Sequence, residues 1–177
     1  MNVRRSGVCF LALLFITLAS PNVPAQTARG VATSTAAAAE KAVQSFFRFH
    51  IARDKSFTRE NIVRRRRWLT PELYRLLLDE YHREELLSEK YRDEVVFMEG
   101  DPFTDTQEHP DAFRVGRAVS RGSWAAVPVT FFLNRHLVRR VRIELSKRGR
   151  VWLIHNILSD DGEDLLKLLR VRLQKTS

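Results

Sequence analysis

Five histidines and one acidic loop are the parts of this chain that could support acid–base or metal chemistry. No two histidines stand at the short spacing of a zinc site. The acids of the loop do not follow the alternate-residue ligand pattern of a calcium loop; they are Asp101, Asp105, Glu108 and Asp111. The sequence also lacks a Gly-x-Ser-x-Gly motif, a His-Glu-x-x-His motif and a phosphate-binding glycine-rich loop. We therefore expect no metal site and no cofactor, and we assign no catalytic residue.

One polar set could still meet in a cavity. His155 shares its parity in a predicted strand with apolar residues, and a core histidine with satisfied hydrogen bonds explains such a position better than an acid or base does. If the sheet curves, His155 would face Tyr74 or Tyr81 and the loop that carries Asp101 and Phe103. These five residues are the candidate pocket.

A cluster of four consecutive arginines is the second candidate site: Arg64, Arg65, Arg66 and Arg67. The cluster ends a short predicted helix, where cations interact favourably with the helix dipole. Four consecutive residues also point around most of a helix's circumference, which favours a solvated helix end. A patch that binds an anionic partner is the alternative, and the sequence leaves both interpretations open.

The N-terminus has the pattern of a secretory signal peptide. Arg4 and Arg5 precede an apolar run over residues 8–19, and Ala25 offers a small residue at which cleavage could follow. The run is too short to span a bilayer, which takes roughly 20 residues, so no transmembrane span is expected after cleavage. The only cysteine, Cys9, lies inside the run, so the exported chain would contain none. We expect a periplasmic or secreted protein.

The whole chain has a net charge of +9, and the exported chain would have +7, because loss of Arg4 and Arg5 leaves 28 basic residues against 21 acids. This charge could simply aid solubility, or it could attract anionic partners. Anionic membrane surfaces, acidic polymers and acidic proteins are accessible outside the cytoplasm, whereas nucleic acid is not an expected partner there.

The elements that must position these residues are helices around a run of strands. Strands are predicted over 113–119, 124–133, 137–146 and 151–158, with short connections typical of hairpins. Helices are predicted over 36–52, from Thr58 into the arginine cluster, from 71 to about 91, and from 160 to 173. In the third of these helices, four residues are expected on the solvent side: Glu80, Arg83, Glu84 and Glu85. The prediction is a single α+β domain over residues 35–174, after a signal peptide (1–25) and a disordered lead-in (26–34).

Parity predicts the two faces of the sheet. Odd-numbered residues from Val127 to Ile157 are mostly apolar and are expected to face the helices. Trp152 and Ile154 have even numbers, so they are expected on the second face, which would then be partly enclosed. Gly116 and Pro128 indicate a bend, a bulge or an edge position in the strands that contain them.

Four segments together resemble a known family: Trp-Leu-Thr-Pro-Glu-Leu-Tyr from Trp68, Glu-Gly-Asp-Pro-Phe-Thr-Asp-Thr-Gln-Glu from Glu99, Ala-Val-Pro-Val-Thr-Phe from Ala126, and Gly-Arg-Val-Trp-Leu-Ile-His-Asn-Ile from Gly149. As an ordered set over residues 38–170 they resemble the bacterial exported family called domain of unknown function 3828. His155 stands where that family often has an acid, which argues against a catalytic role for it. More distantly, the element order is similar to the cone-shaped nuclear transport factor two-like fold. That fold hosts isomerases, dehydratases, immunity proteins and binding modules, so it does not select a function.

The sequence therefore predicts a non-enzymatic, exported binding module for an envelope protein, a peptide or a small molecule. Binding would use the concave face of a curved, four-stranded antiparallel sheet or the arginine cluster. The alternatives are an inhibitor or immunity-type protein that docks on another exported protein, and a small cone-fold isomerase or hydrolase that uses His155.

Overall fold

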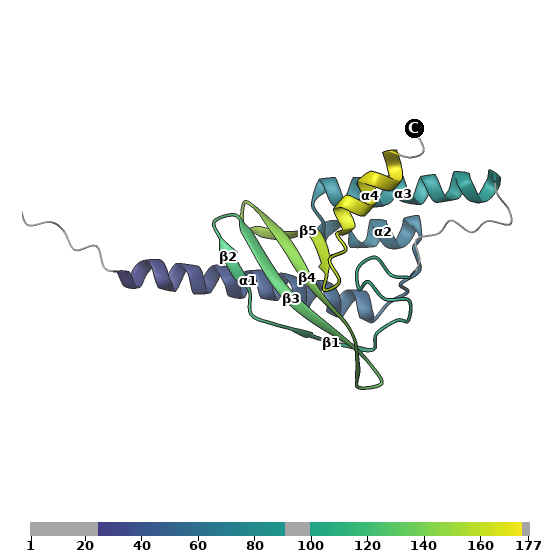
Figure 1. Ribbon diagram of the computed structural model, residues 1–177. Helices are drawn as coiled ribbons and strands as arrows, with labels where there is room; N and C mark the ends of the chain where they lie inside the picture. Colours follow the sequence, from purple (N-terminus) through teal and green to yellow (C-terminus); the bar gives the residue numbers. More distant parts are fainter. Residues whose placement is uncertain (1–24, 91–99, 175–177) are drawn as a thin grey trace, which may run out of the picture.

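A computed structural model describes residues 25–90 and 100–174 of the chain, and it has an α+β fold (Figure 1). The order is α1 (Ala25–Ile51), α2 (Arg59–Arg65), a 3₁₀ helix η1 (Arg66–Trp68), α3 (Pro71–Lys90), β1 (Ala112–Val115), β2 (Val119–Arg121), β3 (Trp124–Leu133), β4 (His136–Arg148), β5 (Val151–Ser159) and α4 (Leu165–Gln174). The predicted signal peptide lies outside the described residues, apart from Ala25. The segment 26–34, for which a disordered lead-in was predicted, belongs to α1.

The sheet is antiparallel and open, with the order β1-β3-β4-β5, and β2 pairs with the same strand as β1. The predicted strand 113–119 is divided, so the sheet has five strands where four were expected. Gly116 lies at the division and donates its N–H to the carbonyl of Pro128 (2.8 Å). A Cβ on Gly116 would lie 2.7 Å from Cγ of Pro128, so this close approach requires glycine. The proline is therefore in a central strand whose neighbour is interrupted.

A β-bulge at the middle of β5 corrects the predicted faces. Glu144 pairs with Asn156, but the next residue of β4, Leu145, pairs with Ile154, so His155 is an extra residue. One extra residue inverts the side-chain parity of the rest of the strand. Trp152 and Ile154 consequently face the buried core. The prediction that they lie on the second face was wrong.

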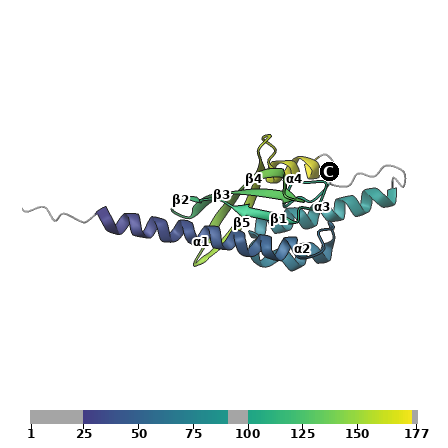
Figure 2. The ribbon, with the colours of Figure 1, turned by 90° about the horizontal axis from the view of Figure 1, so that it is seen from below.

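The core lies between α1 and one face of the sheet. Figure 2 shows α1 along this face and α4 on the opposite side, where α4 contacts β5. The buried residues of α1 repeat at helical spacing and include Val43, Phe46 and Phe47. They pack on the buried side chains of β3 and β4, of which Phe131 and Ile143 are examples.

Three of the four residues on the predicted solvent side of α3 are buried, which is a second correction, whereas Glu85 is exposed as predicted. Glu80, Arg83 and Glu84 are all buried because α4 packs against this face of α3. Arg172 of α4 donates to Glu80 (2.5 Å) and to Glu84 (3.2 Å). Arg83 donates twice to Glu80, at 2.8 and 2.7 Å. These charges are thus neutralised by an interhelical ion-pair network.

Threonine caps start α2 and α3 as the sequence predicts. Thr58 accepts a hydrogen bond from the backbone N–H of Asn61, and Thr70 accepts one from Leu73. The backbone N–H of Thr70 also donates to the carbonyl of Ile154 (2.9 Å). The segment before α3 therefore pairs with the edge of β5 at Ile154. Within the described part of the chain, no helix is long and apolar enough to cross a membrane.

Candidate functional site

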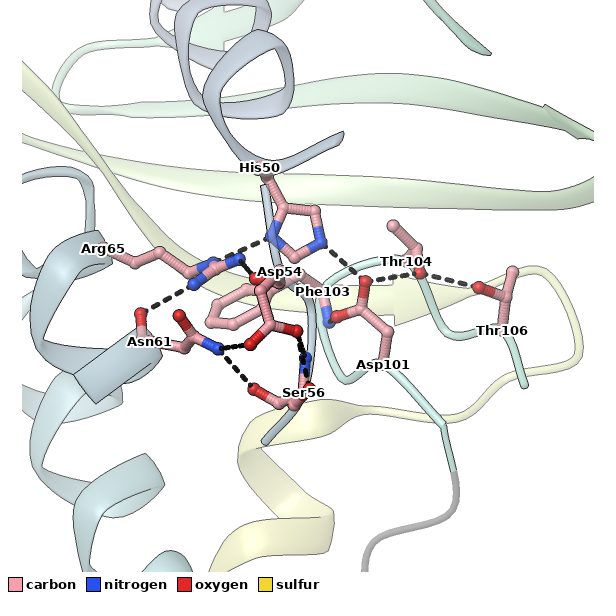
Figure 3. A network of polar contacts seen from close by, with 9 residues as sticks. All are labelled: His50, Asp54, Ser56, Asn61, Arg65, Asp101, Phe103, Thr104 and Thr106. Atoms are coloured by element: carbon pink, nitrogen blue, oxygen red, sulfur yellow. Dashed lines mark hydrogen bonds and ion pairs between the residues drawn. The ribbon is translucent and has the colours of Figure 1, made fainter. Parts of the chain in front are cut away.

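A buried polar network joins the end of α1, the end of α2 and the loop at Asp101 (Figure 3). The Nε–H of Arg65 donates to Nδ1 of His50 (2.8 Å). Because Nδ1 accepts, the imidazole proton is on Nε2, which donates to Oδ2 of Asp101 (2.6 Å). Asp101 also accepts from the backbone N–H of Phe103 and from the hydroxyl of Thr104.

The electrostatics of this network favour a neutral imidazole between two opposite charges. Burial lowers the pKa of His50 below its ordinary value of 6.5, although Asp101 opposes that shift. Burial alone would raise the pKa of Asp101, but His50 and the hydrogen bonds from Phe103 and Thr104 hold it below its ordinary value of 3.8. Burial lowers the pKa of Arg65. The ordinary pKa of arginine is so high that the guanidinium still stays charged at neutral pH.

The histidine–aspartate pair has the composition of a general-base dyad, but its geometry does not suit that role. Both ring nitrogens of His50 are occupied by protein groups, so neither can exchange a proton with a substrate. His50, Arg65 and Asp101 are also at most 1% exposed. The network is therefore structural: it holds α1, α2 and the 101–106 loop together.

The free energy of unfolding is expected to fall as the pH is lowered from about 7.5 to 5.5, by up to about 1.4 kcal/mol per pH unit from His50. The unfolded chain protonates this histidine near pH 6.5, whereas the folded protein does so only at lower pH. The unfolded state thus binds more protons in this window, and acid destabilises the fold. Urea unfolding at both pH values measures the effect. The control variant is His109→Gln, which replaces an exposed histidine and leaves His50 in place. An NMR titration in which His50 protonates at or above pH 6.5 would contradict it.

A groove lined by three of the four clustered arginines is the candidate binding site. It has a volume of about 570 Å³ and is lined by Val63, Arg64, Arg66, Arg67, Leu69, Pro71, Tyr74 and Leu153. Helix α2 ends at Arg65, and the 3₁₀ turn changes the direction of the chain over the next three residues. Arg65 therefore points into the core, while the other three arginines line the groove.

Two of the groove arginines lie against aromatic rings. The guanidinium of Arg66 is 5.3 Å from the ring centroid of Tyr74, and that of Arg67 is 3.9 Å from the ring centroid of Trp68. Arg64 pairs with Glu60 at 2.5 Å, and both side chains are exposed. Among the described residues, no carboxylate forms an ion pair with Arg66 or Arg67. The groove thus presents positive charge beside apolar and aromatic surface.

The five residues of the predicted pocket lie in four different surroundings. Asp101 and Phe103 are at the buried network, and Tyr74 lines the groove. The ring of Tyr81 contacts that of Phe57. The ring of His155 meets the edge of exposed Trp124 at 5.0 Å between centroids. The structure therefore does not bring His155 together with Asp101 or Tyr81 in one cavity.

The sequence contained a signal for one residue that was missed. His50 continues the apolar stripe of α1, three residues after Phe47 and four after Phe46, so its side chain belongs on the buried face. A buried histidine needs hydrogen-bond partners, and Asp101 and Arg65 supply them. Leu153, which completes the groove, carried no such signal, because the bulge determines its face.

Searches against family models, curated proteins and solved structures found no match to this chain. The resemblance to domain of unknown function 3828 and to the nuclear transport factor two-like fold therefore stays a prediction. Among the described residues, no group of three histidine, cysteine, aspartate or glutamate side chains could hold a metal ion.

Proposed function

We propose that this protein is an exported binding module that takes an anionic ligand with an apolar portion in the groove of Arg64, Arg66, Arg67 and Tyr74. One observation carries the proposal: Arg66 and Arg67, whose guanidinium groups have no carboxylate partner among the described residues, flank a wall of Leu69, Tyr74 and Leu153. Export rests on the N-terminal pattern of charged, apolar and small residues.

The chemistry of the groove favours binding over catalysis. Guanidinium groups bind carboxylate, sulfonate or phosphate oxygens through paired N–H donors. The volume of about 570 Å³ lies within the range of roughly 300–1,000 Å³ that is usual for small-molecule sites. Among the described residues that line the groove, none is a histidine, an acid, a serine or a cysteine, so these residues offer neither a carboxylate or imidazole base nor a common nucleophile.

Two dyes of one aromatic skeleton test this proposal. Anilinonaphthalene sulfonate carries an anionic group, and N-phenyl-1-naphthylamine does not. We expect Arg66→Gln/Arg67→Gln to weaken binding of the sulfonate by about tenfold or more, which is the effect of losing one charge-assisted hydrogen bond. Binding of the neutral dye should change less than about twofold. Fluorescence titration measures both affinities.

The matched control removes two arginines from the exposed face of β4. Arg140→Gln/Arg142→Gln makes the same change in net charge at exposed positions outside the groove, so it should leave the affinity for the sulfonate within about twofold. Urea unfolding establishes that both variants are folded. Equal weakening by the two double variants, or none by the groove variant, would contradict the proposed site.

A further inference from the structure

Two hairpin turns protrude from the same end of the sheet. Figure 1 shows the β2–β3 and β4–β5 turns side by side at the end opposite the β3–β4 turn. The backbone N–H of Lys147 donates to the carbonyl of Ser123 (2.7 Å), which ties the two hairpins together. A Cβ on Gly122 or on Gly149 would meet no atom within 4 Å, so each turn has open space beside its glycine.

The side chains at this hairpin end combine positive charge with exposed apolar surface. Val119 is 67% exposed, Trp124 48% and Val151 56%. The cations are Arg121, Lys147, Arg148 and Arg150, and the segments 119–124 and 146–151 contain no acid. Glu144, which lies beside Trp124 in a shallow hollow, accepts a hydrogen bond from Asn156 at 3.5 Å.

We propose that the hairpin end docks on a membrane surface rich in anionic lipid headgroups. Lipid phosphates attract the four cations, and an exposed tryptophan favours the interfacial region of a bilayer. The two exposed valines favour a membrane over a nucleic acid as the partner. Aliphatic side chains gain from burial among acyl chains, whereas they provide no ring on which a base could stack.

The start of α1 is consistent with this orientation. Figures 1 and 2 both place the N-terminal end of α1 toward the same end of the molecule as the two turns. The described N-terminal end of α1, at Ala25, therefore lies toward the proposed membrane-facing side.

Tryptophan fluorescence provides the direct test, because the chain has three tryptophans and the other two, Trp68 and Trp152, are buried. The protein used is the exported chain that the sequence predicts, residues 26–177. We expect vesicles of phosphatidylcholine with phosphatidylglycerol to shift the emission to shorter wavelength, and brominated lipid to quench it. Pure phosphatidylcholine vesicles should have a much smaller effect, and Trp124→Phe should abolish both signals.

Charge reversal identifies the surface. Arg121→Glu/Arg148→Glu/Arg150→Glu should lower partition into the anionic vesicles at least about 100-fold, since each cation near such a surface contributes about fivefold. The control Arg114→Glu/Arg140→Glu/Arg142→Glu makes the same change in charge on exposed positions of β1 and β4 and should have an effect at least tenfold smaller. Equal loss in both variants, no vesicle binding, or binding only to single-stranded DNA would overturn the proposal.

Discussion

Arg65→Met is expected to lower the free energy of unfolding by about 3–5 kcal/mol, the usual cost of removing one of two opposite charges from a buried network, here the one linked to Asp101 through His50. Arg64→Met, one residue earlier, should change it by less than about 1 kcal/mol, because Arg64 forms an exposed pair with Glu60. Urea unfolding at neutral pH measures both values. The two substitutions are chemically identical, so their difference isolates the position of the side chain.

The expected loss follows from what Arg65 leaves behind. Without its guanidinium, Asp101 would be a buried charge whose remaining partners are neutral groups, and Nδ1 of His50 would lose its donor. The carbonyls of Asn61 and Asp54 would lose theirs as well.

A second substitution checks this explanation. In Arg65→Met/Asp101→Asn both charges are gone, so the double variant should be less destabilised than the sum of the two single variants. Additive losses would show that Arg65 and Asp101 do not act as a pair through His50.

Glu80→Gln is expected to lower the free energy of unfolding by about 3 kcal/mol or more, because it leaves two arginines without their shared carboxylate. Burial alone would raise the pKa of Glu80, but the hydrogen bonds from Arg83 and Arg172 hold it below its ordinary value. The charged form is therefore the one that joins α3 to α4. Glu85→Gln, at an exposed position of the same helix, is the control. Thermal and urea unfolding report the loss, and a change below about 1 kcal/mol would show that the ion pairs contribute little.

Much of the fold could be predicted because local patterns determine it. The alternation in β3 and the threonine caps at Thr58 and Thr70 identify their elements without help from the rest of the chain. The bulge at His155 could not be predicted, since no residue near it marks the extra position. The burial of Glu80 depends on Arg172, which is 92 residues away, and no local pattern contains that contact.

The candidate site was predictable in composition but not in geometry. The sequence indicated the arginine cluster as a candidate patch for an anionic partner, and three of its members line the groove. The inward direction of Arg65 depends on where α2 ends and on the position of His50, so spacing alone could not separate it from its neighbours. The apolar wall depends on Leu153, whose face the bulge determines.

The most direct test of the anionic groove is an NMR titration of the ¹⁵N-labelled protein with anilinonaphthalene sulfonate. We expect saturable shifts of the backbone amides of four residues that line the groove, and we expect Arg66→Gln/Arg67→Gln to abolish these shifts. The four are Val63, Leu69, Tyr74 and Leu153. Shifts confined to the hairpin end or to the exposed arginines of β4, with these four amides unchanged, would contradict it.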